Sequence, residues 1–401
     1  MNTITLGDPP AAARPPRAAR SALALLQRLR HGTLEVELPD GRTLAFGSGE
    51  PKAALRVHQW DVFARALASG DIGLAEAWID GQWSTPALTP LLALLLRNRR
   101  ELDDAIYGST LGQLAYRVRH LLRRNSRAGS KRNIQAHYDL GNAFYRLWLD
   151  ETMNYSAGWF PGGHETLPEA QRLKVARALS QAGATQGARV LEIGCGWGAL
   201  AEMAVAEYGA QVVGVTLSHE QLAYARERLA PHGTRADLRL QDYRDIDDAP
   251  FDAICSIEMV EAVGREYWPQ YFATLARLLR PGGRACIQAI VIDDALWDRY
   301  VRGSDFIQQY VFPGGCLPCP REFVRHARAA GLEVVDEFAF GAGYARTLAL
   351  WRERFCAQQD AVRALGFDDR FMRLWEFYLC YCEAAFRERS TDVVQYTLRR
   401  P

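Results

Sequence analysis

The sequence has no apolar run long enough to cross a membrane. Its longest strongly apolar stretch, LLALLL at residues 91–96, falls far short of the roughly 18 residues that a membrane-spanning helix needs. The first twenty residues are rich in Pro, Ala and Arg and lack the apolar core of a signal peptide. We therefore predict a flexible tail over residues 1–20 and a cytoplasmic protein whose contact with the inner face of the membrane is peripheral.

The chain also has almost no excess of charge of one sign. It carries 48 Lys and Arg against 47 Asp and Glu, for a formal net charge of +1. A protein that binds nucleic acid through its overall charge needs a large positive excess. We expect no nucleic-acid partner, and any electrostatic attraction must come from local segments.

Cysteines are few and scattered, which excludes the disulfide framework of small secreted domains. Cys316 and Cys319 have Cys-x-x-Cys spacing, but Cys380 and Cys382 lie in YLCYC, which is typical of an aromatic helix interior. A strong zinc signal needs two tight pairs in loops. We predict no metal site.

The N-terminal part has the pattern of a small α+β module. Residues 32–46 alternate apolar and polar side chains around Asp40-Gly41, which predicts a hairpin. Helical spacing follows, ending in an apolar helix near residues 87–97. Nothing in residues 21–112 has the makings of a catalytic site, so we expect a lipid-binding α+β domain.

Residues 113–132 form a basic segment with seven Lys or Arg and no acid. Leu114, Val118, Leu121 and Leu122 lie on one stripe of the helix that the pattern predicts. A basic amphipathic helix with a flexible linker suits an anionic phospholipid surface. A solvated linker helix whose stripe packs on the protein itself fits equally well.

Residues 133–401 alternate strand-like and helical stretches, which predicts a doubly wound, mostly parallel sheet with its ligand at the carboxyl ends of the strands. One strand ends in VLEIGCGWG, residues 190–198, where Gly194, Gly196 and Gly198 allow a sharp turn. The spacing departs from the dinucleotide pattern G-x-G-x-x-G. Glu192 would repel a pyrophosphate but attract an ammonium group, which favours S-adenosylmethionine over NAD.

Many ordered segments resemble the cyclopropane-fatty-acyl-phospholipid synthases, the mycolic acid cyclopropane synthases and related lipid methyltransferases. The resemblance covers roughly residues 133–390, and the hairpin module is similar to the N-terminal domain of that family. Its segments are NIQAHYDLGNAFYRLWLDETMNYSAGWF, RVLEIGCGWGALA, VVGVTLSHEQLAYARERL, LQDYRD, FDAICSIEMVEAVG, YVFPGGCLPC, FGAGYARTLALW and RLWEFYLCYCEAAFRER. The resemblance implies a class I S-adenosylmethionine-dependent methyltransferase, which is a Rossmann-like α/β fold with a mostly parallel seven-stranded sheet.

The resemblance also implies which residues hold S-adenosylmethionine. They come from the segment before the first strand, the glycine turn and the ends of the next strands. We expect them to be Tyr155, Ser156, Glu192, Gly194, Gly196, Thr216, Leu217, Ser218, Gln221, Asp242, Tyr243, Ser256 and Ile257. Asp242 would accept from the adenine amine, and the Tyr243 ring would pack on the adenine face.

The implied reaction passes a one-carbon unit to the double bond of an unsaturated acyl chain in phospholipid. An isolated alkene is a weak nucleophile, so it must be held against the methyl donor in a dry site, and aromatic faces can stabilise the resulting carbocation. In the resembled family a bound bicarbonate, held by Cys, Glu, His, Tyr and backbone, then removes a proton. The matching positions here are Glu261, Tyr344, Gln288, Ala157 and the backbone of Ile290.

Two of these positions depart from the family pattern. Ala157 stands where the family has Cys, and Gln288 stands where it has His, so no group there changes charge near neutral pH. Cyclopropane formation is the leading expectation, with a methyl or methylene branch as its alternative. The next alternative is methylation of an amine headgroup or of a soluble metabolite. The last is a non-catalytic protein that binds lipid and S-adenosylmethionine. A homodimer is also compatible with the sequence.

Overall fold

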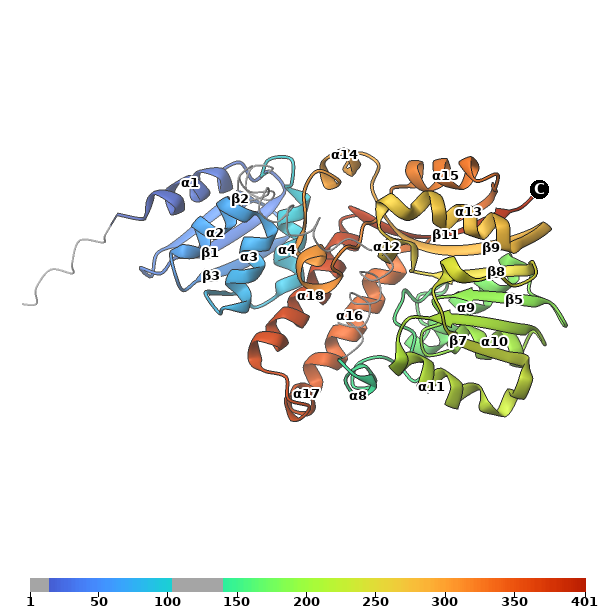
Figure 1. Cartoon of the computed structure of the whole chain (residues 1–401). Helices are drawn as coiled ribbons and strands as arrows, with labels where there is room; N and C mark the ends of the chain where they lie inside the picture. The colour runs from blue at the N-terminus through green and yellow to red at the C-terminus, as the bar shows by residue number, and fades with distance from the viewer. Residues whose placement is uncertain (1–13, 103–139) are drawn as a thin grey trace, which may run out of the picture. The chain divides into compact units, whose positions relative to one another are not determined.

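The computed structural model describes residues 14–102 and 140–401 (Figure 1). The chain forms two compact units, Met1–Gly112 and Gln113–Pro401. The basic segment at 113–132 lies outside the described residues, as do the first thirteen residues of the predicted tail.

The N-terminal unit is a small sheet with helices. Its four strands lie in the order β2-β1-β3-β4, and β1 pairs antiparallel with β2 and parallel with β3. Gly41 adopts a φ of 83° in the turn between β1 and β2, so the predicted hairpin is confirmed. The elements are α1 (Arg17–Leu26), β1 (Gly32–Glu37), β2 (Thr43–Ser48), β3 (Lys52–Val57), α2 (Asp61–Ser69), α3 (Asp71–Ile79), β4 (Trp83–Ser84) and α4 (Leu88–Arg97).

The predicted tail is too long at its C-terminal end. Helix α1 begins at Arg17, and Ala19 within it is fully buried. The small apolar residues after Pro16 favour a helix with one packed face, so residues 17–20 belong to the folded unit.

The C-terminal unit contains a seven-stranded sheet in the order β10-β11-β9-β8-β5-β6-β7. The pairs from β9 through β7 are parallel, whereas β11 runs antiparallel to both of its neighbours. The strands are β5 (Arg189–Ile193), β6 (Gln211–Thr216), β7 (Ala236–Leu240), β8 (Phe251–Ile257), β9 (Leu279–Ile292), β10 (Glu333–Ala339) and β11 (Thr391–Arg399). The doubly wound, mostly parallel sheet predicted from the sequence is confirmed.

Helices cover both faces of this sheet (Figure 1). The α-helices are α8 (Asn142–Arg146), α9 (Leu167–Ala182), α10 (Ala199–Ala206), α11 (His219–Leu229), α12 (Val260–Val263), α13 (Trp268–Leu278), α14 (Trp297–Tyr300), α15 (Pro320–Ala329), α16 (Gly341–Ala357), α17 (Gln359–Ala364) and α18 (Asp369–Arg387). Shorter 3-10 or π turns are η1 (Ala230–Arg235), η2 (Tyr243–Asp245), η3 (Arg265–Tyr267) and η4 (Ile307–Val311).

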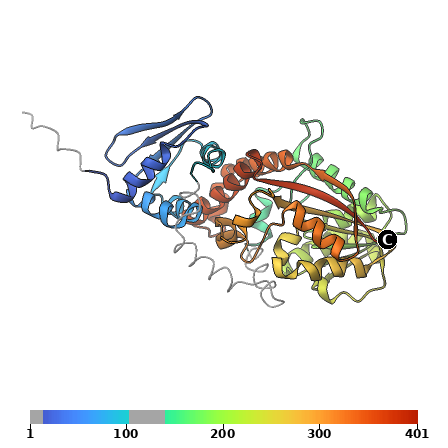
Figure 2. The same ribbon diagram turned by 90° about the horizontal axis from the view of Figure 1, so that it is seen from above.

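Two apolar clusters form the core, one on each face of the sheet. One joins the sheet to α13 and α15, and the other joins it to α9, α10 and α11. Helices α16 and α18 pack against each other, as Figure 2 shows from above. Cys380 is buried within α18, which confirms YLCYC as a helix interior.

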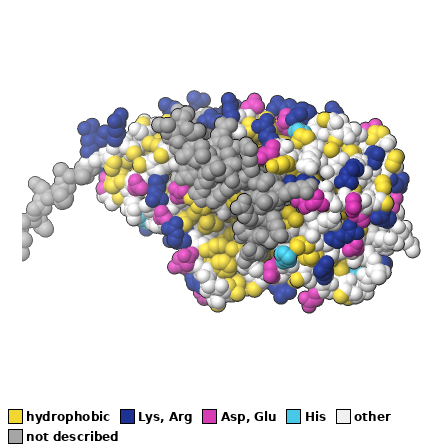
Figure 3. Space-filling view, in the orientation of Figure 1, with side chains coloured by type: hydrophobic (Ala, Val, Ile, Leu, Met, Phe, Trp, Pro, Cys, Tyr) yellow, Lys and Arg dark blue, Asp and Glu magenta, His cyan; other side chains and the backbone are white. Residues whose placement is uncertain are grey.

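The described surface carries mixed charge. On the face seen in Figure 3, Lys and Arg side chains are intermingled with Asp and Glu. Over residues 14–102 and 140–401, no helix is both long and apolar enough to cross a membrane.

Candidate active site

The glycine turn after β5 requires glycine and leaves open space at its centre. Gly194, Gly196 and Gly198 have φ values of 83°, 52° and 85°, in the left-handed region that favours glycine. A Cβ atom added to Gly196 would meet no heavy atom within 4 Å, whereas one added to Gly198 would lie 2.7 Å from Leu229 in α11. Gly198 therefore packs closely against α11, and Gly196 leaves room for a ligand.

Glu192 lies at the end of β5 beside this turn. Its side chain is buried, and its Oε2 atom has no hydrogen-bond partner among the described residues. Burial raises the pKa of Glu192 to about 8, and the charge of Lys174 opposes that rise. A buried acid with a vacant oxygen suits an ammonium ligand, because pairing would offset the cost of ionising the carboxyl.

A buried polar cluster follows β6. The Thr216 hydroxyl donates to Gln221 Oε1 at 3.0 Å, and the Ser218 hydroxyl accepts from the Gln221 backbone N–H at 3.2 Å. Ser218 thereby caps the N-terminus of α11. Leu217, between them, is half-buried. The cap fixes these groups at the carboxyl end of β6.

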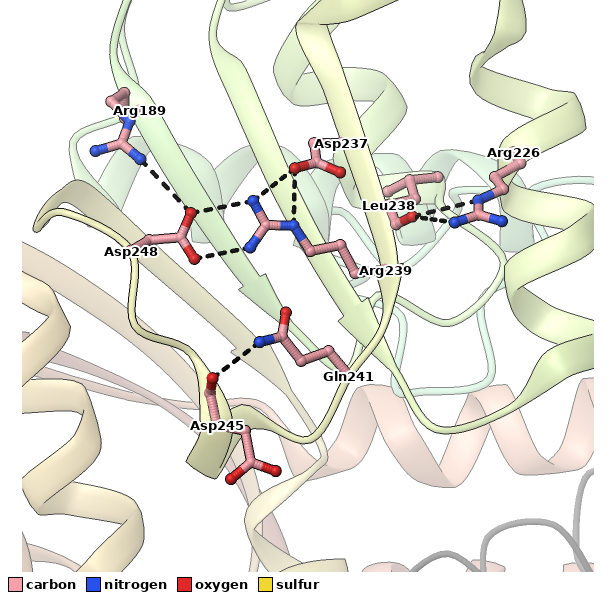
Figure 4. A network of polar contacts seen from close by, with 8 residues as sticks. All are labelled: Arg189, Arg226, Asp237, Leu238, Arg239, Gln241, Asp245 and Asp248. Carbon is pink, nitrogen blue, oxygen red and sulfur yellow. Dashed lines mark hydrogen bonds and ion pairs between the residues drawn. The ribbon is translucent and has the colours of Figure 1, made fainter.

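Asp242 and Tyr243 follow β7 in a loop that is fastened at both ends. Arg239 pairs with Asp237 and with Asp248 across the loop, and Gln241 Nε2 donates to the Asp245 carbonyl at 2.9 Å (Figure 4). These contacts hold the turn that carries the two predicted adenine ligands.

Asp242 is already engaged within that loop. Its two oxygens accept from the Arg244 guanidinium at 2.8 and 2.5 Å. The hydroxyl of Tyr243 is buried, with no hydrogen-bond partner among the described residues. Tyr243 therefore offers a vacant polar group, whereas Asp242 would have to accept a ligand on its remaining lone pairs.

The end of β8 carries an acid that the sequence analysis did not single out. Ser256 is fully buried, Ile257 is half-buried, and Glu258 follows with a φ of 50°. Glu258 Oε1 accepts from the Ala157 backbone N–H at 2.8 Å and from Gln288 Nε2 at 2.7 Å. Its Oε2 accepts from the Tyr344 hydroxyl at 2.7 Å. We call these four residues the Glu258 cluster.

Three predicted catalytic residues thus meet around an acid that was not predicted. The segment SIEMVEAVG holds two glutamates three residues apart, and the resemblance pointed to the second. The available signal for Glu258 was its place directly after a buried strand, where ligands of parallel sheets gather.

Glu261 forms a second, smaller site with Ile290. One carboxyl oxygen accepts from the Ile290 backbone N–H, and the other has no hydrogen-bond partner in the described ranges. Burial raises the pKa of Glu261 to about 8, and the negative charge of Glu258 adds to the rise. The two glutamates therefore share one buried region.

The acid pair lies beside the glycine turn and beside an aromatic wall. A Cβ atom added to Gly194 would lie 3.1 Å from Met259 Cγ, directly after Glu258. Tyr155, two residues before Ala157, has its ring centroid 5.4 Å from that of Trp148 and 5.4 Å from that of Trp351. Tyr344, which donates to Glu258, has its ring centroid 6.2 Å from that of Trp351, so this aromatic cluster adjoins the acid pair.

Lys174 on α9 is a second residue that the sequence analysis missed. It is fully buried, and its Nζ donates to the Ser156 hydroxyl at 2.6 Å. Burial lowers the pKa of Lys174 to about 8. The negative charge of Glu258 makes the largest opposing contribution. Its place in QRLKVARALS gave no sign of this, because the flanking pattern is typical of an amphipathic helix.

These features lie at the carboxyl ends of neighbouring strands in a seven-stranded sheet with an antiparallel β11. A glycine turn with an acid before it and no phosphate-binding spacing defines a class I S-adenosylmethionine-dependent methyltransferase.

Comparison with known proteins identifies the family. Residues 125–396 match the family described as mycolic acid cyclopropane synthetase. The chain is 41% identical over 413 residues to the tuberculostearic acid methyltransferase of Mycobacterium tuberculosis. This alignment covers 98% of this chain and 95% of that protein. It is 35% identical over 361 residues to the cyclopropane-fatty-acyl-phospholipid synthase of Escherichia coli K12, covering 88% and 89%.

A solved structure agrees with this assignment. A mycolic acid cyclopropane synthase complexed with SAH and CTAB has a TM-score of 0.63 and 32% sequence identity, covering 67% of this chain and 97% of that one. The chain belongs to the mycolic acid cyclopropane synthetase family and is an S-adenosylmethionine-dependent methyltransferase.

The residues at the glycine turn fit S-adenosylmethionine. Glu192 offers a vacant buried oxygen to its ammonium group, and Gly196 leaves space above the turn. The residues expected to hold bicarbonate do not fit that ion. The Ala157, Gln288 and Tyr344 donors already bind Glu258, and the Ile290 N–H binds Glu261. An added anion would also face the carboxyl groups of Glu258 and Glu261, both half-buried acids.

Proposed function

We propose that this enzyme transfers a one-carbon unit from S-adenosylmethionine to the cis double bond of an unsaturated acyl chain in phospholipid. The observation that carries the proposal is a pair of half-buried acids, Glu258 and Glu261, beside both the glycine turn and an aromatic cluster. A methylated amine or hydroxyl loses an N–H or O–H proton that water can accept, whereas an alkene needs a dry site and a positioned base for a C–H proton.

The chain's own residues have distinct parts in this reaction. Glu192 and the glycine turn bind and orient the cofactor, which supplies an electrophilic methyl group when bound. The Tyr155, Trp148 and Trp351 rings pack against one another next to the site, and aromatic rings there would exclude water and stabilise a cationic carbon. A fixed negative charge at Glu258 lowers the energy of that cation further.

Membrane contact is part of the proposal. The substrate is an acyl chain of a phospholipid, so the enzyme must work at a lipid surface. We assign this contact to a lipid-binding domain at residues 21–112 and to the basic segment at 113–132, ahead of a catalytic domain at 133–401. Salt-sensitive binding to vesicles of anionic phospholipid is the expected behaviour.

The same transfer of a methyl group to the alkene can lead to two kinds of product. Ring closure gives a cyclopropane, as the name of the Escherichia coli relative implies. A second candidate, a methyl or methylene branch, is supported by the higher identity to a relative named a methyltransferase, 41% against 35%. Both begin with addition of the methyl group to the alkene.

The test is incubation of the enzyme with S-adenosylmethionine and vesicles of oleoyl or stearoyl phosphatidylethanolamine. We expect the oleoyl lipid to gain one CH2 by mass spectrometry, with release of S-adenosylhomocysteine, and the stearoyl lipid to stay unchanged. NMR then separates ring methylene protons from alkene protons of a branch. A gain on the stearoyl lipid would mean headgroup methylation and would overturn the proposal, as would the absence of any gain.

A further inference from the structure

The orientation of Gln288 toward Glu258 is set by a chain of hydrogen bonds that begins at Arg177. Arg177 Nη1 donates to Gln395 Oε1 at 2.8 Å, and Gln395 Nε2 donates to Gln288 Oε1 at 3.0 Å. Gln288 Nε2 then donates to Glu258 at 2.7 Å. A guanidinium can only donate, so each amide in the chain must accept on one side and donate on the other.

The start of this chain is fastened independently. Arg177 Nη2 donates to Asp336 Oδ2 at 2.6 Å, and its guanidinium carbon lies 3.9 Å from the centroid of the Phe338 ring. Gln395 Nε2 also donates to the Lys174 carbonyl at 3.1 Å. Four elements, α9, β9, β10 and β11, therefore cooperate to present an N–H group to Glu258.

Among the described residues, every hydrogen-bond partner of the Glu258 carboxyl is a donor. The Ala157 N–H comes from the loop before α9, the Tyr344 hydroxyl from α16 and the Gln288 amide from β9. Hydrogen bonds to the charged form favour ionisation of a carboxyl. The buried ammonium of Lys174 acts in the same direction, against burial, which raises the pKa of Glu258.

Glu261 on α12 is the acidic neighbour of Glu258, and its surroundings are different. One oxygen accepts from the Ile290 backbone N–H, and the second oxygen has no hydrogen-bond partner in the part of the chain that the structure describes. When two buried carboxyls interact, the one with fewer donors holds the proton first. Three donors surround the Glu258 carboxyl, and one backbone N–H reaches that of Glu261, so the hydrogen bonds favour the ionised form of Glu258 over that of Glu261.

We propose that Glu258 is the base of the reaction. This side chain would then do the work that a bound anion would otherwise do. This rests on the proposed function. Glu258 Oε2 accepts one hydrogen bond, from Tyr344, and so keeps one lone pair for a proton. Arg177 and Gln395 are positioning residues that act through Gln288.

The proton transfer balances without a further reactant. A C–H bond of the newly added methyl group breaks, and its proton passes to Glu258 Oε2. The electron pair of that bond forms either the closing C–C bond of a ring or, after a hydride shift, the C=C bond of a methylene branch. The positive charge of the lipid is cancelled, and Glu258 later returns its proton to water.

The first test compares Glu258→Gln with the wild type, using Glu227→Gln, an exposed glutamate of α11, as the control. General-base catalysis contributes about 10²–10⁴-fold to rate. We expect a loss of that size in product formation, with binding of S-adenosylhomocysteine within about threefold of wild type as the measure of folding. If the wild type converts the oleoyl lipid and Glu258→Gln does so at an undiminished rate, the inference fails while the proposed function stands.

The second test needs no change at Glu258. The wild type in buffer freed of carbon dioxide should keep its rate when bicarbonate is added back, and a rate that depends on bicarbonate would overturn the inference. Gln395→Glu should reverse the amide of Gln288, because a glutamate accepts from Arg177 but cannot donate to Gln288. The acidic limb of the kcat/KM profile should then move to higher pH, whereas an unmoved limb would contradict the donor chain.

Discussion

Replacement of Glu192 by Gln tests how the glycine turn recognises its ligand. Burial raises the pKa of Glu192 to about 8, so at pH 7 roughly one tenth of the free enzyme carries the charge at this position. An ammonium ligand prefers that ionised form. Between pH 6 and pH 7.5, where the ligand amine stays protonated, affinity should rise about tenfold per pH unit, or about 1.4 kcal/mol.

The variant should lose both the affinity and its pH dependence. Removing one partner of a buried charge pair costs about 2–5 kcal/mol, so Glu192→Gln should weaken binding of S-adenosylhomocysteine by about a hundredfold near pH 7.5. Titration calorimetry at pH 6.5 in buffers of different ionisation enthalpy should show nearly one proton released by the wild type and none by the variant. Glu207→Gln, an exposed acid at the end of α10, is the control. Affinity that is flat with pH, or a variant that binds as the wild type does, would refute this reasoning.

Three further predictions concern stability, each measured by urea unfolding. The pKa of Glu261 is raised to about 8, so the folded state binds more protons than the unfolded state between about pH 4.3 and 8, and stability falls as pH rises. Glu261→Gln should reduce the difference in free energy of unfolding between pH 5 and pH 8 by more than about 1.4 kcal/mol. An unchanged difference would contradict the raised pKa. Gly198→Ala would place a Cβ 2.7 Å from Leu229 in α11, whereas Gly183→Ala would meet nothing within 4 Å, and both positions have a positive φ. The backbone strain is therefore shared, and overpacking should make the first cost about 1 kcal/mol more than the second. Equal costs would show that α11 yields. The hydrogen-bonded Arg239 guanidinium lowers the pKa of Asp248, so the stabilising charge of Asp248 is lost as the pH falls through its folded-state pKa. Arg239→Met should cost about 1 kcal/mol of stability at pH 7 and less at pH 3. An equal cost at both pH values would contradict the ion pair.

Local pattern was enough to predict a doubly wound, mostly parallel sheet, but not its strand order. The alternation of apolar strands and helices, and the glycines after β5, depend on residues close together in sequence. The antiparallel β11 was not located from the sequence, because its partners β9 and β10 are decided by the fold rather than by its own residues.

The catalytic residues were predictable in part, for a related reason. The positions of Ala157, Gln288 and Tyr344 follow from motifs, but what they bind does not. Only the fold shows that their donors converge on Glu258 rather than on Glu261. Gln395 lies 107 residues after Gln288, and no pattern near either residue announces their hydrogen bond.

The most direct test of the account is the fate of a deuterated methyl group. S-adenosylmethionine labelled with three deuterium atoms on its methyl group is incubated with the enzyme and oleoyl phospholipid, and the product is analysed by mass spectrometry and NMR. We predict that the added carbon keeps two deuterium atoms, since Glu258 removes the third. An added carbon that keeps all three would contradict the proposed proton transfer, and label in the headgroup would contradict the acyl chain as substrate.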